Sequence, residues 1–313
     1  MKHLLDLRFL VLAGKGGVGR TTVAAVIARV ATRLGKRVLL AQTNAPERLG
    51  RMLGCKTAIG AVVTPIDERL SAVNMTPKQS LHEYGVMLLK YEPLYRAVFE
   101  NKPMRSFLGA FPGLDYWTML GKAWWHTTEL EHGRAKYDLI LLDGPASGHA
   151  AAMLRIPDAV KSAMPKGPLA RDATLARDLL SDEKQTAVVL VTLPEELPAR
   201  ETSTLARDIR ELRMPLGPLV VNAMPPAAAT DPALDKVLAA NANTPPPPEL
   251  AGILAGVNVL AARRRDAERI VTGLASDPGL PMLQLPRLPS NDLGPEEIAH
   301  LADLLATALS IQT

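Results

Sequence analysis

The sequence has one cysteine, Cys55, among its 313 residues. A single cysteine excludes a disulfide framework and a cysteine-based structural zinc site within the chain, and it suits a reducing compartment. No segment has the length and apolarity of a membrane span. The positive charges behind the net charge of +4 are scattered, so nucleic-acid binding is not indicated. The N-terminal segment runs into the first apolar stretch without room for a signal peptide, and we expect a cytoplasmic protein.

The stretch from Phe9 to Thr22, FLVLAGKGGVGRTT, has the pattern of a phosphate-binding loop. Residues 9–12 predict a buried strand, a glycine run follows, and the alanine-rich segment 21–34 predicts a helix. Glycines let the backbone point several N–H groups at one anion, and the helix N-terminus adds its positive end. We therefore predict that this loop holds phosphates, through Gly14, Lys15, Gly16, Gly17, Val18, Gly19, Arg20, Thr21 and Thr22.

The loop fits the template G-x-x-x-x-G-K-[ST] from Gly14 to Thr21 at every position but one. The lysine of the template is Arg20, and a second cation, Lys15, lies just inside the first glycine. Thr21 is placed to give its hydroxyl to a Mg²⁺ ion. The alternative is a glycine-rich turn that binds nothing, and four glycines, two hydroxyls and two cations at this spacing argue against it.

Strand-like and helix-like segments alternate through the rest of the chain. Residues 37–41 complete a βαβ unit with the first strand and helix, which indicates a parallel sheet. Further strands are expected at 70–75, 137–143, 187–191, 219–221 and 282–285, and further helices at 199–212, 249–274 and 295–309. The alternation predicts an α/β fold with a doubly wound, mostly parallel sheet, forming a single domain over residues 1–313.

Two segments interrupt this alternation. Residues 76–135 are helical in pattern and rich in aromatics, and they predict an inserted helical subdomain whose first helix has Thr76 as its cap and Gln79 at the capping-box position. An aromatic groove for a client is one interpretation, although packing against the sheet is the commoner cause of such a stripe. Residues 223–248 are rich in proline and alanine and predict a linker or surface excursion.

Two polar residues follow predicted strands. The segment YDLILLD ends in Asp143, from which a carboxylate can hold the shell of a Mg²⁺ ion, or alternatively cap the following loop. Residues 144–149, GPASGH, predict a flexible loop of small residues. Asn222 ends its strand at the edge where open parallel sheets bind ligands.

These motifs resemble those of the ATPase class with a deviant Walker A loop, and in particular its ArsA/Get branch. GKGGVGRTT resembles the Walker A loop, YDLILLDGPASGH resembles Walker B with switch II, and LPRLPSNDLGPEEIAHL resembles the C-terminal nucleotide-base loop. The MinD and ParA branches fit less well, because a basic membrane helix and a basic DNA patch are missing. The resemblance spans nearly the whole chain and implies a SIMIBI-type P-loop NTPase fold in a homodimer or pseudodimer.

The resemblance also implies roles for individual residues. The loop would hold the phosphates of ATP, with Thr21 and Asp143 serving Mg²⁺. Lys15 would reach across the dimer to the partner's nucleotide. The base would be recognised by three residues beyond the loop, which are Asn222, Pro286 and Leu288.

Three departures from the family pattern bear on activity. Arg20 replaces the loop lysine, but it keeps the charge and can fork onto two phosphate oxygens, so binding should survive. Asn44 stands where the family has the aspartate that positions water. The Cys-x-x-Cys zinc clamp of the targeting ATPase is missing after Asn222, and the three-cysteine metalloid site of ArsA is missing too.

Two functional hypotheses follow. The first is a Mg-ATPase that opens and closes as a dimer to act on a partner or client protein. The second is a regulatory subunit with weak hydrolysis that works beside a related ATPase. Asn44 cannot accept a proton from water, and such assistance is worth typically ~10²–10⁴ in rate. The sequence therefore predicts nucleotide binding more strongly than turnover.

Overall fold

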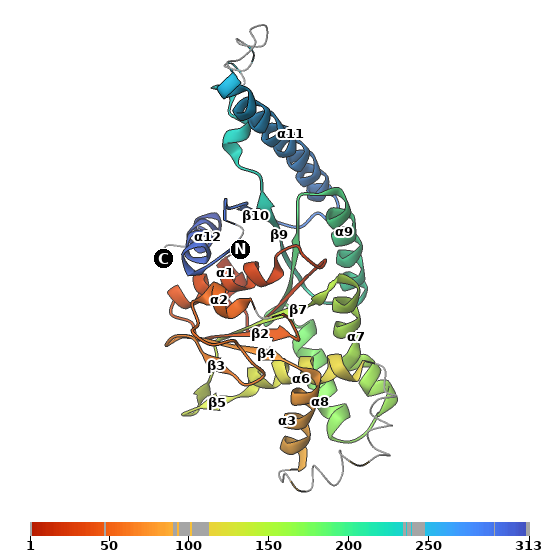
Figure 1. Ribbon diagram of the computed structural model, residues 1–313. Coiled ribbons are helices and arrows are strands. Elements are labelled where there is room, and N and C mark those ends of the chain that lie inside the picture. Colours follow the sequence, from red (N-terminus) through yellow and green to blue (C-terminus); the bar gives the residue numbers. More distant parts are fainter. Residues whose placement is uncertain are drawn as a thin grey trace.

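The chain folds around one central β-sheet with helices on both faces (Figure 1). The computed structural model describes residues 2–46, 48–89, 93, 101, 113–233, 236, 239, 248–290 and 292–310. The strands are β1 (Phe9–Gly14), β2 (Val38–Thr43), β3 (Thr64–Pro65), β4 (Leu70–Met75), β5 (Leu130–Glu131), β6 (Arg134–Ala135), β7 (Leu139–Ala146), β8 (Thr186–Thr192), β9 (Leu216–Met224) and β10 (Met282–Pro286). The α-helices are α1 (Arg20–Arg33), α2 (Leu49–Leu53), α3 (Pro77–Leu89), α6 (Leu114–Thr128), α7 (Ser147–Ala163), α8 (Pro168–Ser181), α9 (Glu196–Glu211), α11 (Pro248–Ser276) and α12 (Pro295–Ala308), and short 3₁₀ helices span Lys2–Asp6 and Ala227–Thr230.

The strands of the main sheet lie in the order β10-β9-β8-β1-β7-β2-β4-β3. All neighbouring pairs are parallel except β3 with β4 at one edge. The first strand therefore lies inside the sheet, between β7 and β8. Since parallel strands point the same way, the loops that follow β1, β2 and β7 leave from one edge.

The strands are apolar on both faces because helices cover both faces. Every residue of β1 and of β2 is buried, as expected for a parallel sheet that is covered on each side. Leu10 and Leu12 face a core that includes α1 and α12, while Phe9 and Val11 face a second core that includes α6, α7 and α9. This alternation follows from the two-residue period of a strand.

The structure confirms the predicted fold class, and most predicted strands agree to within three residues at each end. The predicted Thr76 cap of α3 is present, since the Gln79 nitrogen lies 3.4 Å from Thr76 Oγ1. The capping-box role predicted for Gln79 was wrong, because its side chain donates to Glu83 Oε1 at 3.2 Å, one turn further along the helix. The expected loop at residues 144–149 was wrong. Strand β7 continues to Ala146 because Ala146 pairs with Gly14, and α7 begins at the next residue.

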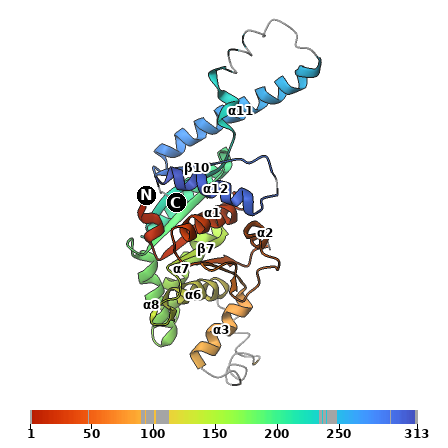
Figure 2. The same ribbon diagram turned by 90° about the vertical axis from the view of Figure 1, so that its left-hand side faces the viewer.

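The predicted helical subdomain at residues 76–135 and the predicted proline-rich excursion at 223–248 lie only partly within the described residues. Helices α3 and α6 pack together, with α6 against one face of the sheet, and the β5–β6 hairpin follows α6 (Figure 1). Most of residues 90–112 and of 234–247 lies outside the described residues, so the limits of the subdomain stay a prediction. Helix α11 projects from one end of the molecule (Figure 2). None of the helices described here is both long enough and apolar enough to cross a membrane.

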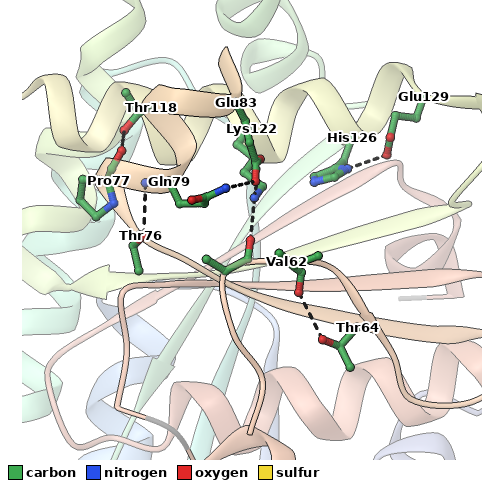
Figure 3. Close-up of polar contacts among 11 residues, drawn as sticks. Val62, Thr64, Thr76, Pro77, Gln79, Glu83, Thr118, Lys122, His126 and Glu129 are labelled. Carbon is green, nitrogen blue, oxygen red and sulfur yellow. Dashed lines mark hydrogen bonds and ion pairs between the residues drawn. The ribbon is translucent and has the colours of Figure 1, made fainter. Parts of the chain in front are cut away.

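A half-buried ion pair joins α3 to α6, and its lysine also contacts the segment before β3 (Figure 3). Lys122 Nζ lies 2.6 Å from Glu83 Oε2, and it donates to the carbonyl oxygen of Ala61 at 2.9 Å. The side chain of Lys122 is 7% exposed, while that of Glu83 is 38% exposed. Removing the lysine would leave a carboxylate and a carbonyl without their partner in a mostly buried place, which is costly.

We expect Lys122→Ala to lower the free energy of unfolding by about 2 kcal/mol, because the Ala61 carbonyl and the Glu83 carboxylate both lose a donor that is itself buried. The matched control is Lys36→Ala, which removes the surface pair of Lys36 with Asp6, whose side chain is 65% exposed. An exposed pair of this kind contributes about 1 kcal/mol or less. Urea unfolding of the two variants measures the difference, and equal losses would contradict the buried role of Lys122.

Candidate nucleotide-binding site

The predicted loop forms one wall of a cleft at the edge where β1, β2 and β7 end. The cleft has a volume of about 590 Å³. It is lined by Lys15, Gly17, Gly19, Arg20, Thr21, Thr22, Thr43, Asn44, Ala45, Pro46, Arg48, Met52, Asp143, Gly144, Pro145 and Ala146. The structure thus brings most of the residues predicted from the loop together with Asn44 and Asp143. Gly14, Gly16 and Val18 do not line the cleft, and Val18 is buried beneath the loop.

The turn into α1 is built around Gly19. This residue precedes the helix with a φ of 87°, which a glycine adopts without steric cost. Asn222, at the end of β9, donates from Nδ2 to the carbonyl oxygen of Val18 at 3.0 Å. A Cβ on Gly19 would lie 2.2 Å from the same Nδ2 atom. The end of β9 therefore fixes the loop from behind, and only glycine leaves room for it.

Thr21 and Asp143 face each other across the floor of the cleft. Thr21 Oγ1 donates to Asp143 Oδ2 at 2.6 Å, and Gln42 Nε2 lies 3.3 Å from the same oxygen. Burial raises the pKa of the Asp143 carboxyl, while the Thr21 hydrogen bond, the Arg20 charge and the Gln42 hydrogen bond oppose that rise. The other carboxylate oxygen, Oδ1, is buried without a hydrogen-bond partner among the described atoms.

This donor set fits Mg²⁺. A hydroxyl and a carboxylate oxygen are hard ligands, and Mg²⁺ is usually bound by one or two protein oxygens with phosphates and waters completing the shell. The described residues contain no cluster of three or more His, Cys, Asp or Glu side chains that could hold a metal ion. The cleft therefore offers the kind of site in which the substrate supplies the remaining ligands.

Arg20 crosses the loop toward the end of β7. Its Nη1 donates to the carbonyl oxygens of Gly14 at 2.5 Å and Pro145 at 2.7 Å, and its Nε lies 3.7 Å from Asp143 Oδ1. Burial lowers the pKa of the Arg20 guanidinium, and the Asp143 carboxylate opposes the change. The guanidinium thus forms part of the cleft wall beside the predicted metal site.

Lys15 and Asn44 both line the cleft and are held by contacts outside it. Lys15 forms a 2.8 Å ion pair with Glu201 of α9, and both side chains are about one-third exposed. Asn44 has a left-handed backbone conformation, with a φ of 47°, and its N–H donates to the carbonyl oxygen of Met75 at 2.7 Å. The sequence analysis missed Glu201, because no local pattern links a residue of α9 to the loop after β1.

The residues predicted to recognise the base do not line this cleft. A second cleft of about 640 Å³ lies where β8, β9 and β10 end, against α11, and Arg287 lines it. Pro286 ends β10, and Leu288 packs against the core around α1 and α12. Asn222 lies beside Gly19 and lines neither cleft. Recognition of the nucleotide base by these three residues therefore stays a prediction.

Substitution of Gly19 separates backbone strain from the steric clash. We expect Gly35→Ala to cost about 1–2 kcal/mol, because Gly35 also has a positive φ, 84°, but has nothing within 4 Å of the added Cβ. Gly19→Ala should cost at least twice as much, because the same strain is joined by the clash with Asn222. Urea unfolding of both variants measures this, and equal costs would show that Asn222 does not hold the loop.

Comparison with known proteins places the chain among ATPases. The sequence model of the family described as anion-transporting ATPase matches residues 7–172 and 169–243. ATPase BagA of Mycobacterium tuberculosis is 26% identical over 230 residues, which cover 72% of this chain and 67% of that protein. ATPase get3 of Schizosaccharomyces japonicus is 26% identical over 173 residues, covering 53% of this chain and 50% of that protein. The arsenical pump-driving ATPase of Acidiphilium multivorum is 25% identical over 242 residues, covering 71% of this chain and 40% of that protein.

The family match extends over well more than half of the sequence and contains the loop, Asn44, Asp143 and Asn222. It also agrees with the order of motifs along the chain and with the parallel sheet around β1. The chain therefore belongs to the anion-transporting ATPase family of the ArsA/Get type.

Proposed function

We propose that this ATPase binds Mg²⁺-ATP in the cleft beside the loop and uses hydrolysis in a dimer to act on a partner or client protein. The observation that carries the proposal is the convergence of Thr21, Asp143 and Arg20 on one wall of the cleft. A hydroxyl and a carboxylate suit the metal, and a guanidinium suits phosphate oxygens. No nucleic acid takes part in this proposal.

We assign the phosphates to residues 14–22, which form the loop after β1 and the first turn of α1. Mg²⁺, when bound by Thr21 and Asp143, neutralises charge on the terminal phosphates. Arg20 would exchange its carbonyl contacts with Gly14 and Pro145 for phosphate oxygens, because hydrogen bonds between two charged groups are stronger than those to a carbonyl. The guanidinium is already in the wall of the cleft, so only the side chain must turn.

The base is assigned to the side of the loop away from Asp143. The Nδ2 of Asn222 donates to Val18, which leaves its Oδ1 as the group for the base. An amide oxygen accepts a hydrogen bond from the 6-amino group of adenine, whereas the 6-oxo group of guanine offers no donor there. Pro286 and Leu288, at and just after the end of β10, would complete the base site.

Lys15 is the residue that supports a dimer in this proposal. In the described chain this lysine is held by Glu201, and both side chains remain partly exposed to solvent. In a closed dimer Lys15 would leave Glu201 and stabilise charge on the nucleotide of the neighbouring subunit. Both a homodimer and a heterodimer with a related ATPase satisfy this assignment. The single cysteine, Cys55, favours the cytoplasm as the compartment.

A regulatory subunit with weak hydrolysis is the second candidate function, and Asn44 favours it. Asn44 lines the cleft at the position where the family pattern has an aspartate. An amide orients water but does not accept its proton. Pairing with a related subunit that retains the aspartate would give one fast site, with Lys15 acting there across the interface.

Hydrolysis measured on the purified chain and on the complex from its native host separates the two candidates. We expect the purified chain by itself to hydrolyse ATP slowly. Asn44→Asp should raise its kcat by about tenfold or more, because a proton acceptor is restored. Asn258→Asp, the same change at an exposed position on α11, is the control and should leave kcat unaltered. Ordinary turnover by a chain that purifies without a related partner would contradict the heteromeric function. Absence of ATP binding and hydrolysis in every preparation would contradict the proposal as a whole.

A further inference from the structure

Asn74 binds the loop that carries Asn44. It lies on β4, next to β2 in the sheet, where Asn74 pairs with Gln42 and Met75 with Thr43. The Ala45 N–H donates to Asn74 Oδ1 at 3.0 Å, and Asn74 Nδ2 donates to the Ala45 carbonyl oxygen at 2.7 Å. One side chain thus satisfies both peptide groups of a residue that has left the sheet and lines the cleft.

The two hydrogen bonds require an amide. The Ala45 N–H can only donate and its carbonyl can only accept, so the side chain at position 74 must present one acceptor and one donor. An ionised aspartate of the same size offers acceptors alone and would place a charged oxygen against the Ala45 carbonyl. With the bond from Asn44 N–H to Met75, three hydrogen bonds hold two consecutive residues and keep Asn44 in its left-handed conformation.

The support for Asn74 is itself fixed. The backbone N–H of Asn74 donates to the carbonyl oxygen of Gly60 at 2.8 Å. The carbonyl of the next residue, Ala61, accepts from Lys122 on α6, whose ion pair with Glu83 is shown in Figure 3. The loop at the cleft is therefore connected through β4 and residues 60–61 to the packed pair of helices α3 and α6.

We infer that Asn74 is a positioning residue for ATP hydrolysis, which holds residues 44–46 against the cleft so that Asn44 faces the terminal phosphate. The inference rests on the proposed nucleotide site. Asn74 does not line the cleft and acts through Ala45 and Asn44. Loss of the two hydrogen bonds frees the loop, and a displacement of about 1 Å at a reacting centre can cost ~10² in rate.

The test compares Asn74→Ala and Asn74→Asp with the same changes at the exposed Asn258. We expect Asn74→Ala to lower kcat tenfold or more with the KM for ATP changed less than threefold. Asn74→Asp should lose as much at pH 8, where the introduced carboxyl is ionised, and recover part of the loss at the lowest pH at which wild type is still active. The recovery follows because a protonated carboxyl again offers one donor and one acceptor. Asn74→Ala has no such group, so its deficit should not vary with pH.

A wild-type kcat in both Asn74 variants, or a change confined to KM, would overturn the inference. Hydrogen exchange at the Ala45 amide gives a readout that needs no turnover: protection should fall in Asn74→Ala relative to wild type and remain in Asn258→Ala, because only the first variant removes the oxygen that accepts from this N–H. Unchanged protection in folded Asn74→Ala also overturns the inference, and the kinetics of Asn74→Asp supply the test if Asn74→Ala does not fold. The proposed function can also fail separately. If wild-type protein binds no ATP but Ala45 protection still depends on Asn74, the proposed function is contradicted, whereas the two hydrogen bonds between Asn74 and Ala45 still hold the loop.

Discussion

A buried carboxylate on β7, Asp143, is the constraint on which the arrangement of the cleft depends. Its side chain is 3% exposed, and an unpaired charge in such a place costs several kcal/mol. The compensation comes from three elements: Thr21 on the first turn of α1, Gln42 on β2, and the more distant charge of Arg20. These contacts draw the start of α1 toward β7 and β2. The loop between β1 and α1 consequently passes over the sheet edge at the place where phosphates are proposed to bind.

The fold could be predicted from the sequence because its signals are local. Apolar runs without alternation mark strands that are buried on both faces, and β1 begins where such a run predicts it, at Phe9. The glycine run and the helix after it give the strand–loop–helix order. The loop predicted at residues 144–149 was wrong because the structure there depends on a contact that is not local. Gly144 and Pro145 are typical of a loop, but β7 is extended by pairing with β1, a partner distant in the sequence.

The candidate site divides in the same way. Its phosphate and metal residues lie in two short motifs, so the sequence predicts them and the parallel sheet brings them together. Asn74 and Glu201 could not be predicted, because each contact depends on strand register or on where a distant helix is placed. The residues predicted to recognise the base are only partly brought to the loop. Asn222 lies beside Gly19 of the loop. Pro286 and Leu288 lie at and just after the end of β10, and their role stays a prediction.

The central claim is that Mg²⁺-ATP occupies the cleft between the loop, Asn44 and Asp143. A crystal structure of the chain with Mg²⁺ and a non-hydrolysable ATP analogue tests it most directly. The account predicts the triphosphate along residues 14–22, the Arg20 guanidinium on its terminal oxygens, and the metal at about 2.1 Å from Thr21 Oγ1. An analogue that binds only in the second cleft beside α11, or a metal bound away from both Thr21 and Asp143, would contradict the account.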